Sequence, residues 1–540
     1  MTVIAAEQGD VYFDIDDSSA APRGRSTMET GVIIVGAGPV GLMLAGELHL
    51  GGVKVTVFDK TTAPSGESRA LGFNRRAAES LDQRGLLPRL GAFRWGPMGH
   101  FGGVRFDLGM LDEDHSGVLG LSQARTEDML GSWLAELGVP VRRGHEVTGV
   151  REEPDGVVVS FTGPEGPGQE RARYVVGCDG PHSTVRTAAG IRAKEWPATR
   201  GMYTAEITGV QLRPRPIGER LPGGHMVVCT PLGEGRYRIV VHDKTLPPQQ
   251  NPDALTFPQI ADAWQRLTGE SIHHAEAQWM WACGNAAGLA EEYRRGRVLL
   301  AGDAAHAMPP LAAWGLSAGL QDAANLGWKL AAVLAGWAPA HLLDTYHGER
   351  HPIGEQLIRN AQAASLLYLG DADMDPLRGV LGELMEHKEA AGHLAGIVSG
   401  LGIGYAMGPG EHPLLGRRMP LDRELALPGG GTTRVADLLH SARGVLIAAD
   451  GGDGGGGAGK AARLAEEWAD RVDIVTGTWT DHPDHPAEAA LEAVLIRPDG
   501  YVAWTSPGSD SDLTDVLGDW FGAPRAAAPP ATGATHRTGA

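Results

Sequence analysis

The chain has 540 residues, and 47 Lys and Arg against 66 Asp and Glu give a formal charge of -19 at neutral pH. This balance argues against a nucleic-acid partner, because such binding depends on basic side chains that neutralise phosphates. No run approaches the roughly 18 apolar residues of a membrane span, and the start lacks the order of a signal peptide. Cys178, Cys229 and Cys283 lie far apart and form no CxxC pair, which favours a reducing cytoplasm and excludes a disulfide framework or zinc site.

In the first half of the chain, the amino-acid composition changes at residue 31. Residues 1–30 are acidic with few large apolar side chains, so we expect them to be disordered, and Met28 could be the native start. Residues 31–58 then contain an apolar run, a glycine-rich turn, a helical pattern and a second apolar run, which predict a βαβ unit. Further helices are predicted at 74–90 and 123–138, and short strands at 141–178.

The second half of the chain contains two more regions. Strand-like runs dominate residues 197–290 and predict a β-rich layer, after which a buried strand at 297–300 precedes a long helix that starts near Leu316. Residues 412–522 alternate between helical stretches such as 461–469 and apolar runs, which is typical of a small α/β domain. Those apolar runs are residues 444–448, 472–475, 493–496 and 501–504.

The clearest local motif is Gly36-Ala37-Gly38-Pro39-Val40-Gly41, between the first predicted strand and the first predicted helix. The first glycine permits a tight turn, the second lets the backbone approach a pyrophosphate at the positive helix end, and the third allows close helix packing. Asp59, at the end of the second strand, can accept hydrogen bonds from ribose hydroxyls. The pattern predicts a dinucleotide site without deciding between FAD and NAD.

Later segments resemble the class A flavin-dependent aromatic hydroxylases, the p-hydroxybenzoate hydroxylase-like monooxygenases. Residues 177–186, GCDGPHSTVR, match their Asp-Gly signature, and residues 300–306, LAGDAAH, with Pro309-Pro310 match their second FAD motif. The match continues at residues 321–330, QDAANLGWKL, and at Ser68-Arg69-Ala70. The resemblance covers residues 31 to about 370 and implies that the dinucleotide is FAD.

The resemblance also implies roles for individual residues. Asp303 would bind the ribityl chain, the following loop would hold the pyrimidine edge of the flavin, and Arg69 would lie near the pyrophosphate and the mobile flavin. Arg69, Pro310 and Trp314 are candidates for the pocket; no catalytic side chain is assigned, and no metal is expected. The residues expected to contact FAD are Gly36, Gly38, Pro39, Val40, Gly41, Asp59, Lys60, Arg69, Gln123, Asp179, Asp303, Pro310, Gly315, Leu316 and Ser317.

The fold implied by the resemblance is α/β. It comprises a doubly wound Rossmann-like FAD domain from residues 31–196 and 291–400, an inserted β-sheet substrate domain at 197–290 and a thioredoxin-like domain at 410–522. Residues 497–504, RPDGYVAW, are a recognisable part of the last domain, which lacks CxxC and should be redox-inert. The tail at 523–540 is rich in Ala, Pro, Thr and Gly and is expected to be disordered.

One loop departs from the family pattern. After the second proline the hydroxylases usually read x-Gly-Gly-Gln-Gly-x-Asn, whereas this chain reads Leu311-Ala312-Ala313-Trp314-Gly315-Leu316-Ser317. Because this loop passes close to the flavin ring, an indole there would reshape the site. Two interpretations remain open: a compensated variation in a working hydroxylase, or an altered or lost monooxygenase step.

The predicted function follows from the cofactor. In such enzymes NAD(P)H, a transient co-substrate, reduces FAD, and O2 then forms a flavin C4a-hydroperoxide that hydroxylates the substrate. The prediction is therefore a monooxygenase of antibiotic biosynthesis that acts on an aromatic or polyketide-derived small molecule. The alternative is a cyclase like the decalin-forming [4+2] enzymes of spirotetramate pathways, in which FAD is structural and no net redox occurs. Either enzyme could be a homodimer.

Weaker patterns have simpler explanations. Residues 454–460 mimic a phosphate-binding loop, but Ala461 replaces the Ser or Thr that would reach magnesium, which favours a surface loop. His347 and His351 have a spacing that could seat a metal, although a polar face on a helix ended by Pro352 explains them better. Three tryptophans could wall an aromatic pocket: Trp95, Trp281 and Trp314.

Overall fold

The computed structural model describes residues 30–91, 93, 95–111, 117–248, 254–311, 314–449, 456–480, 491–509 and 511–525. Several predictions from the sequence lie wholly or largely outside these residues. They concern the acidic extension at 1–30, the tail at 523–540, and Ala312 with Ala313. Of the phosphate-loop mimic at 454–460, only residues 454–455 lie outside; the expectation of a surface loop is wrong for residues 457–460, which form the first turn of helix α11 (Gly457–Ala465).

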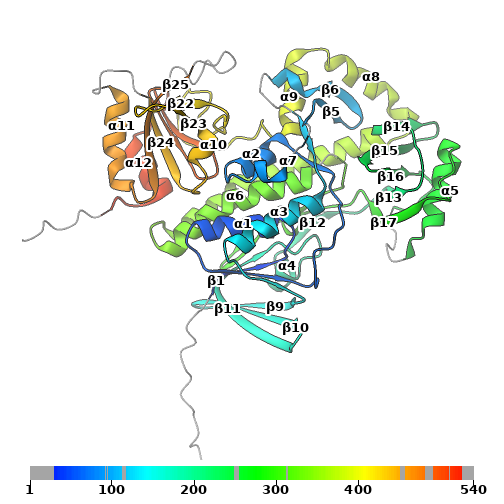
Figure 1. The fold of residues 1–540 in the computed structure, drawn as a ribbon, viewed down its shortest axis with the longest axis horizontal. Coiled ribbons are helices and arrows are strands. Elements are labelled where there is room, and N and C mark those ends of the chain that lie inside the picture. The colour runs from blue at the N-terminus through cyan, green and yellow to red at the C-terminus, as the bar shows by residue number, and fades with distance from the viewer. Residues whose placement is uncertain are drawn as a thin grey trace, which may run out of the picture.

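A mainly parallel sheet carries the N-terminal βαβ unit (Figure 1). Its path runs β19-β20-β11-β1-β2-β8, in which the five strands from β20 to β8 are parallel, and the antiparallel strands β10 and β9 continue from β11. The interior position of β1 follows from its apolar residues 32–35, which are buried on both faces. The strands are β1 (Thr30–Val35), β2 (Val55–Asp59), β8 (Val141–Arg143), β9 (Glu146–Glu153), β10 (Gly156–Gly163), β11 (Gly166–Gly177), β19 (Arg294–Arg295) and β20 (Val298–Leu300).

Helices α1 (Pro39–Leu50), α3 (Gln123–Glu136) and α6 (Trp314–Ala335) accompany this sheet, with α1 packed against both α3 and α6. The close packing needs Gly46, because a Cβ there would lie 2.0 Å from the Trp133 ring. This arrangement agrees with the predicted α/β class. The single helix predicted at 74–90 is wrong: α2 (Arg75–Asp82) ends early, since Gly85 has a φ of 64°, and a short 3-10 turn at Leu87–Leu90 follows.

A second, antiparallel sheet has the order β14-β15-β16-β13-β17. Helix α5 (Phe257–Thr268) covers one face, where Ile260 and Trp264 pack against Ile239 and Val241. Because side chains alternate along a strand, the intervening residues of the same strands point to the opposite face, away from α5. The strands are β13 (Gly201–Thr208), β14 (Arg215–Leu221), β15 (His225–Gly233), β16 (Arg236–His242) and β17 (Glu276–Gly284).

Helix α7 (Asp344–Leu369) follows α6 and is longer than the sequence suggests. The expectation that a helix ends at Pro352 is wrong, because Pro352 lies inside α7 and the helix continues through buried Leu357 and Ile358. Packing of that buried face outweighs the one backbone bond that proline removes. Beyond α7, helices α8 (Asp375–Leu384) and α9 (Lys388–Ser399) lie beside the hairpin of β5 (Met98–Phe101) and β6 (Val104–Asp107) (Figure 1).

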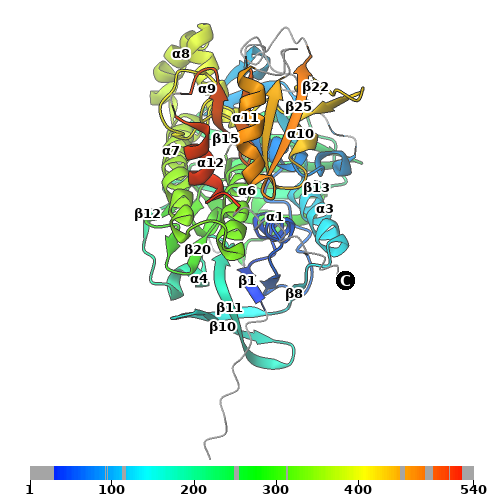
Figure 2. The ribbon, with the colours of Figure 1, turned by 90° about the vertical axis from the view of Figure 1, so that its left-hand side faces the viewer.

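The C-terminal unit contains a six-stranded sheet of order β23-β22-β25-β24-β26-β27. Strands β24 and β25 are parallel, and β26 and β27 form an antiparallel hairpin beside β24, as in a thioredoxin-like sheet. The unit lies beside α6 and α7 (Figures 1 and 2). Its elements are β22 (Glu424–Ala426), β23 (Thr432–Arg434), α10 (Val435–Leu438), β24 (Gly444–Ala449), α11 (Gly457–Ala465), β25 (Val472–Trp479), β26 (Ala493–Ile496), β27 (Val502–Ser506) and α12 (Leu513–Phe521).

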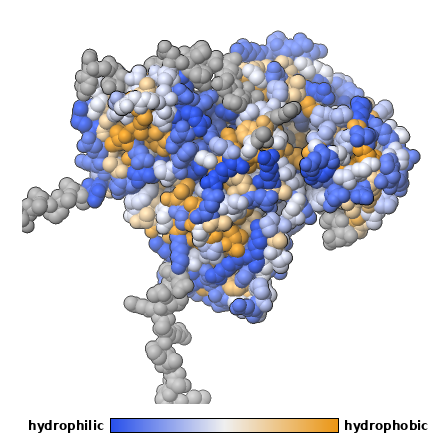
Figure 3. Space-filling model, viewed as in Figure 1, coloured by the Kyte–Doolittle hydropathy of each residue, from blue (hydrophilic) through white to orange (hydrophobic). Residues whose placement is uncertain are grey.

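The surface is mixed. Hydrophilic side chains predominate on the face in Figure 3, and apolar patches show between them over the C-terminal unit and the centre of the molecule. Helix α8 leaves Leu377, Val380 and Leu384 exposed. Among the described helices, none combines the length and apolar character needed to cross a bilayer.

Candidate cofactor and substrate site

A cavity of about 1090 Å³ lies between the parallel sheet and the antiparallel sheet. One side, which we call the cofactor wall, consists of Gly38, Pro39, Val40, Arg69, Gln123, Asp303, Pro310, Gly315 and Leu316. The other side, the sheet wall, consists of Met202, Met226, Val228, Val240, Trp281 and Cys283. Both walls belong to one continuous cavity, so a molecule bound on one side can meet a molecule bound on the other.

The glycine turn before α1 has the shape that an anion site requires. Gly36 has a φ of 107°, and a Cβ on Gly41 would lie 2.0 Å from the Gly36 carbonyl oxygen, so both positions exclude larger residues. A Cβ on Gly38 would meet nothing within 4 Å, which leaves open space in front of the helix. No side chain caps the first amides of α1, and these amides can bind a phosphate.

Asp59 lies beside this turn but not in the cavity lining. Its Oδ2 accepts a hydrogen bond of 2.7 Å from the Ala37 amide, and its Oδ1 accepts one of 2.8 Å from the Thr61 amide. The carboxylate therefore fixes the turn. Lys60 is exposed to solvent and, like Asp59, is absent from the cavity lining.

The segment around Arg69 crosses toward the sheet wall. The Arg69 guanidinium lies 5.4 Å from the centre of the Trp281 ring, a distance that permits a cation–π interaction. Gln123, the first residue of α3, accepts a 3.4 Å hydrogen bond from the Ala70 amide and donates one of 2.8 Å to Glu127. Arg69 thus connects the two walls.

The second FAD motif forms a short 3-10 turn at Gly302–Ala304. Gly302 has a φ of 63°, and its amide donates to Asp322 Oδ2 at 3.0 Å, which also lies 2.5 Å from His306 Nε2. Burial opposes a charge on His306, but the Asp322 carboxylate outweighs burial and raises the pKa of His306. This buried pair leaves Asp303 exposed to the cavity, where enclosure by protein atoms raises the pKa of its carboxyl.

Two further sequence candidates have structural partners outside the cavity. Asp179 accepts hydrogen bonds from Ser183 Oγ at 2.5 Å and from the Val185 amide at 3.1 Å, so its carboxylate caps the short helix α4 (Thr184–Ala188). Ser317 is buried, and its Oγ accepts a 3.0 Å hydrogen bond from the Asn74 amide. Both side chains therefore support the wall from behind.

Trp314 is the first residue of α6 and reaches the cavity. Only 3% of Trp314 is exposed, and its ring centre lies 6.1 Å from that of Phe101 on β5. Of the three tryptophans considered from the sequence, Trp281 and Trp314 line the cavity, whereas Trp95 packs under the Arg75 guanidinium. The indole that replaces the family's amide therefore contributes an apolar surface.

The sheet wall is largely apolar, although Arg238 of β16 also lines the cavity and pairs there with Glu206. Two other ionisable groups of the cavity lining, Cys283 and His100, are neutral. Burial raises the pKa of the Cys283 thiol to about 12. Burial also lowers the pKa of His100, which lines the cavity from β5, to about 4, and the nearby Arg105 adds to this shift. Both side chains are uncharged near neutral pH. Such a surface suits a flat apolar molecule with few charges.

The cofactor wall fits FAD. The open space before Gly38 and the uncapped amides of α1 suit a pyrophosphate, and the Asp303 carboxylate faces the same cavity, as a ribityl hydroxyl would require. The rings of His347 and His351 lie with their centres 4.7 Å apart and are tilted by 42°, but within the described residues no group of three or more His, Cys, Asp or Glu could hold a metal.

Comparison with known proteins agrees with this geometry. Residues 29–361 match a family model described as an FAD binding domain, and residues 412–524 match one described as aromatic-ring hydroxylase, C-terminal. The chain belongs to the FAD-dependent aromatic-ring hydroxylase family. It is an oxidoreductase family of monooxygenases that use FAD, which confirms the resemblance seen in the sequence.

Three relatives show the range of this family. The crystal structure of CabE, an aromatic hydroxylase from angucycline biosynthesis, is 48% identical, covers 92% of this chain and all of its own, and has a TM-score of 0.87. The 12-dehydrotetracycline 5-monooxygenase/anhydrotetracycline 6-monooxygenase of Streptomyces rimosus is 39% identical over 92% of this chain and its full length. The dialkyldecalin synthase of Streptomyces rugosporus is 34% identical over 92% of this chain and 99% of its own.

Some lining residues have no motif in the sequence. His100 comes from the β5 hairpin, and Tyr368 comes from the end of α7, far away along the chain. The alternation along β13, β15, β16 and β17 was the one available signal for the sheet wall. It identifies two sets of residues but does not say which set faces the cavity.

Proposed function

We propose that this chain hydroxylates a fused-ring aromatic polyketide, with FAD on the cofactor wall and the substrate on the sheet wall. The observation that carries the proposal is the single cavity lined by Gly38 and Asp303 on one side and by Met226, Val228 and Val240 on the other. The hydroxylases that resemble this chain over 92% of its length support it, since one is described as an aromatic hydroxylase from angucycline biosynthesis and another is named for dehydrotetracycline and anhydrotetracycline.

The proposed cofactor contacts come from the first wall. The amides at the start of α1 would bind the pyrophosphate, and Asp303 would accept a hydrogen bond from the ribityl chain. Asp59 would bind the adenosine ribose while its other contacts hold the turn. Pro310, Gly315 and Leu316 would border the flavin ring.

Bound FAD would supply the redox chemistry, with NAD(P)H as the reductant and O2 as the source of the transferred oxygen atom. The side chains of this protein then have three tasks. The apolar sheet wall excludes water and orients the ring against the cofactor. Arg69, stacked on Trp281, holds the boundary between the two sites. Trp314 closes one side, so that a flat ring system can pack against its indole.

Turnover with labelled oxygen tests this function. Purified holoenzyme is mixed with NADPH and with anhydrotetracycline, or with an angucycline-type tetracycle, under isotopically labelled O2. We expect substrate to accelerate NADPH oxidation and one labelled oxygen atom to appear in the product. NADPH oxidation that yields only hydrogen peroxide with every aromatic tetracycle would contradict the proposal.

A second candidate is a cyclase in which FAD is structural. The dialkyldecalin synthase among the relatives and the apolar indole of Trp314 at the cavity favour it. A cyclase needs only a shaped apolar cavity that folds a polyene. Cyclised product formed from a linear polyene in the absence of NADPH and O2 would support this candidate and exclude the hydroxylase as the main activity.

The cellular location and the oligomeric state of the enzyme also stay predictions. We place it in the cytoplasm, where NAD(P)H is available, and the three cysteines, which are all free thiols, are compatible with this placement. A homodimer is predicted as well. Light scattering of the purified holoenzyme measures its mass and decides the second point.

A further inference from the structure

The turn between β26 and β27 inserts into the FAD-binding part of the chain. This turn, Arg497–Gly500, closes with a 2.8 Å hydrogen bond from the Gly500 amide to the Arg497 carbonyl. Two buried arginines from α2 and its end hold its carbonyl groups: Arg76 donates to Asp499 O at 2.7 Å, and Arg84 donates to Pro498 O at 2.9 Å. The C-terminal unit is thus attached through polar contacts of this turn, Arg497–Gly500, and we call the site where the turn binds the polar seat.

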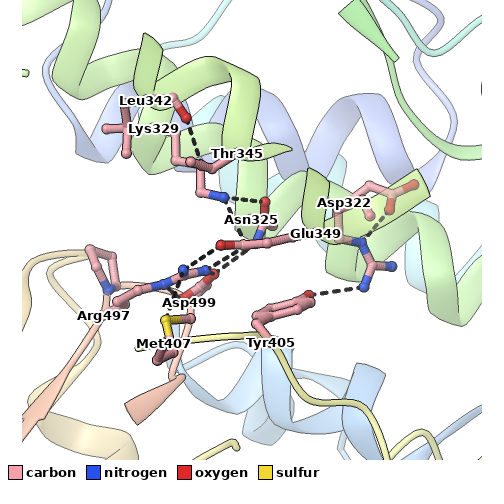
Figure 4. Close-up of polar contacts among 12 residues, drawn as sticks. Asp322, Asn325, Lys329, Leu342, Thr345, Glu349, Tyr405, Met407, Arg497 and Asp499 are labelled. Carbon is pink, nitrogen blue, oxygen red and sulfur yellow. Dashed lines mark hydrogen bonds and ion pairs between the residues drawn. The ribbon is translucent and has the colours of Figure 1, made fainter. Parts of the chain in front are cut away.

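Charged side chains complete this seat (Figure 4). Arg497 is fully buried and donates to both Glu349 carboxylate oxygens, at 2.7 Å and 2.9 Å. Lys329 donates to Glu349 at 2.8 Å, and Asn325 joins Glu349 at 2.6 Å to Asp499 at 3.0 Å. Glu349 belongs to α7, so the turn and this helix are fixed to each other by paired charges.

The next residue of α7 points to the cofactor wall. Arg350 Nε donates to Asp322 Oδ1 at 2.7 Å, while the other carboxylate oxygen of Asp322 holds the Gly302 amide and the His306 ring. Asp322 thereby connects Arg350 to both ends of the Gly302–His306 segment, which presents Asp303 to the cavity. All three charged groups, Arg350, Asp322 and His306, are buried.

Arg350 makes two more hydrogen bonds. Its Nη2 donates to the Ala318 carbonyl of α6 at 3.1 Å, and its Nη1 reaches the segment that precedes the C-terminal unit. Arg350 Nη1 donates to the Tyr405 hydroxyl at 3.0 Å, and the Tyr405 ring centre lies 4.2 Å from that of Tyr501, the residue after the inserted turn. Glu349 therefore contacts the C-terminal unit directly, whereas Arg350 reaches it through Tyr405, which packs on Tyr501, and also holds the flavin-side segment. Figure 4 labels Tyr405 and Asp322, the two side chains that both accept hydrogen bonds from Arg350.

We propose that Glu349 and Arg350 are positioning residues through which the C-terminal unit fixes the Gly302–His306 segment for the flavin. Buried ion pairs add little net stability but define one geometry, because any displacement leaves a charge unpaired. The seated turn therefore holds α7, Arg350 holds Asp322, and Asp322 holds the segment. The inference rests on the proposed placement of the flavin beside Asp303.

Isosteric variants test whether these residues position the Gly302–His306 segment or only attach the C-terminal unit. Glu349→Gln removes the charge that pairs with Arg497, and Tyr405→Phe removes only the hydroxyl that contacts Arg350. The matched control is Asp82→Asn, which breaks an ion pair with Arg434 across the same boundary, 3.2 Å long, on α2 instead of α7. Hydrogen exchange of the full-length apoprotein is followed in peptides covering 301–307 and 412–524, and FAD titration with bound-flavin fluorescence at saturation is measured in parallel.

We expect Glu349→Gln and Tyr405→Phe to speed exchange at 301–307 and to weaken FAD binding by about tenfold and about threefold, respectively, while altering bound-flavin fluorescence. Asp82→Asn should change none of these. Unchanged exchange at 301–307 in Tyr405→Phe, or equal effects in the control, would overturn the proposal. If Glu349→Gln fails to fold, Tyr405→Phe alone decides. Faster exchange with unaltered FAD binding and fluorescence would support the positioning role and contradict the flavin placement.

Discussion

The two walls of the cavity are built in different ways. On the cofactor wall the decisive features are backbone turns at Gly38 and Gly302, fixed by hydrogen bonds to Asp59 and Asp322. On the sheet wall they are side chains such as Val228 and Val240, which project from strands whose other face is packed on α5. A wall made of backbone binds a constant ligand, whereas a wall made of side chains can change its shape by substitution. Substitutions on one wall should therefore change cofactor binding, and substitutions on the other should change substrate binding.

The largest effect on cofactor binding alone is expected from a substitution at Gly38. Its φ of −76° and ψ of 178° suit alanine, and a Cβ meets no protein atom within 4 Å, so Gly38→Ala should fold as stably as the parent. The methyl group would occupy the space that the pyrophosphate needs. We expect the dissociation constant for FAD to rise by about 30-fold, or ~2 kcal/mol, in a fluorescence titration of the apoprotein.

The control for this variant is Gly131→Ala in α3. This glycine also has no atom within 4 Å of a Cβ, but it does not line the cavity. We expect its thermal midpoint to be equal or higher and its FAD affinity to be unchanged. Equal FAD affinity in Gly38→Ala and the parent would mean that the pyrophosphate binds elsewhere.

The next effect concerns the sheet wall. Val228→Phe places a ring in the cavity, and we expect the KM for a tetracyclic aromatic substrate to change by about tenfold, or ~1.4 kcal/mol, with no change in FAD affinity. The neighbouring Val227 faces the α5 layer and is fully buried. Val227→Phe should instead cost about 1–3 kcal/mol of unfolding free energy and leave KM alone. Coupled losses of FAD and substrate binding in Val228→Phe would contradict the division into two walls.

This division also explains what the sequence could predict. The cofactor wall depends on local features, a turn between a strand and a helix, and therefore Gly36, Gly38 and Gly41 are found from their spacing. Asp303 is found from the resemblance to the family's second FAD motif. The sheet wall depends on which face of a sheet is covered, and this is decided by α5, a contact between separate segments. The indole of Trp314 is visible in the sequence, but its contact with Phe101 is not.

The polar seat of the C-terminal unit was beyond prediction for a related reason. Arg497 and Glu349 are 148 positions apart. Arg497 belongs to a recognisable motif and Glu349 to a polar stretch, but nothing in either segment indicates that the two side chains pair. Only the packing of the β26–β27 turn against α7 removes both from water. By contrast, the β24–α11–β25 unit was predictable because β24 is a continuous apolar run and β25 begins with three apolar residues among its first four.

A smaller effect is expected on acidification. Burial lowers the pKa of His100 from 6.5 to about 4, so between these values the unfolded chain binds a proton that the folded chain does not. The free energy of unfolding therefore falls as the pH drops from 6.5 toward 4. His100→Gln cannot bind this proton and should lose less stability over the same range. Chemical denaturation at pH 7 and pH 5 measures the difference, and equal losses in both proteins would show that His100 titrates normally.

The smallest effect is expected at Lys60, which the family resemblance places among the cofactor contacts. The side chain is exposed on the loop after β2 and lies outside the cavity lining, so solvent screens its charge from the proposed pyrophosphate. We expect Lys60→Ala to change the FAD dissociation constant by less than about twofold, or ~0.4 kcal/mol, at physiological salt. Asp59→Asn is the comparison, because it weakens the hydrogen bond that holds the Ala37 amide and should have the larger effect. A tenfold loss in Lys60→Ala would instead mean that the adenosine half extends past Asp59, and the cofactor wall would then continue onto that loop.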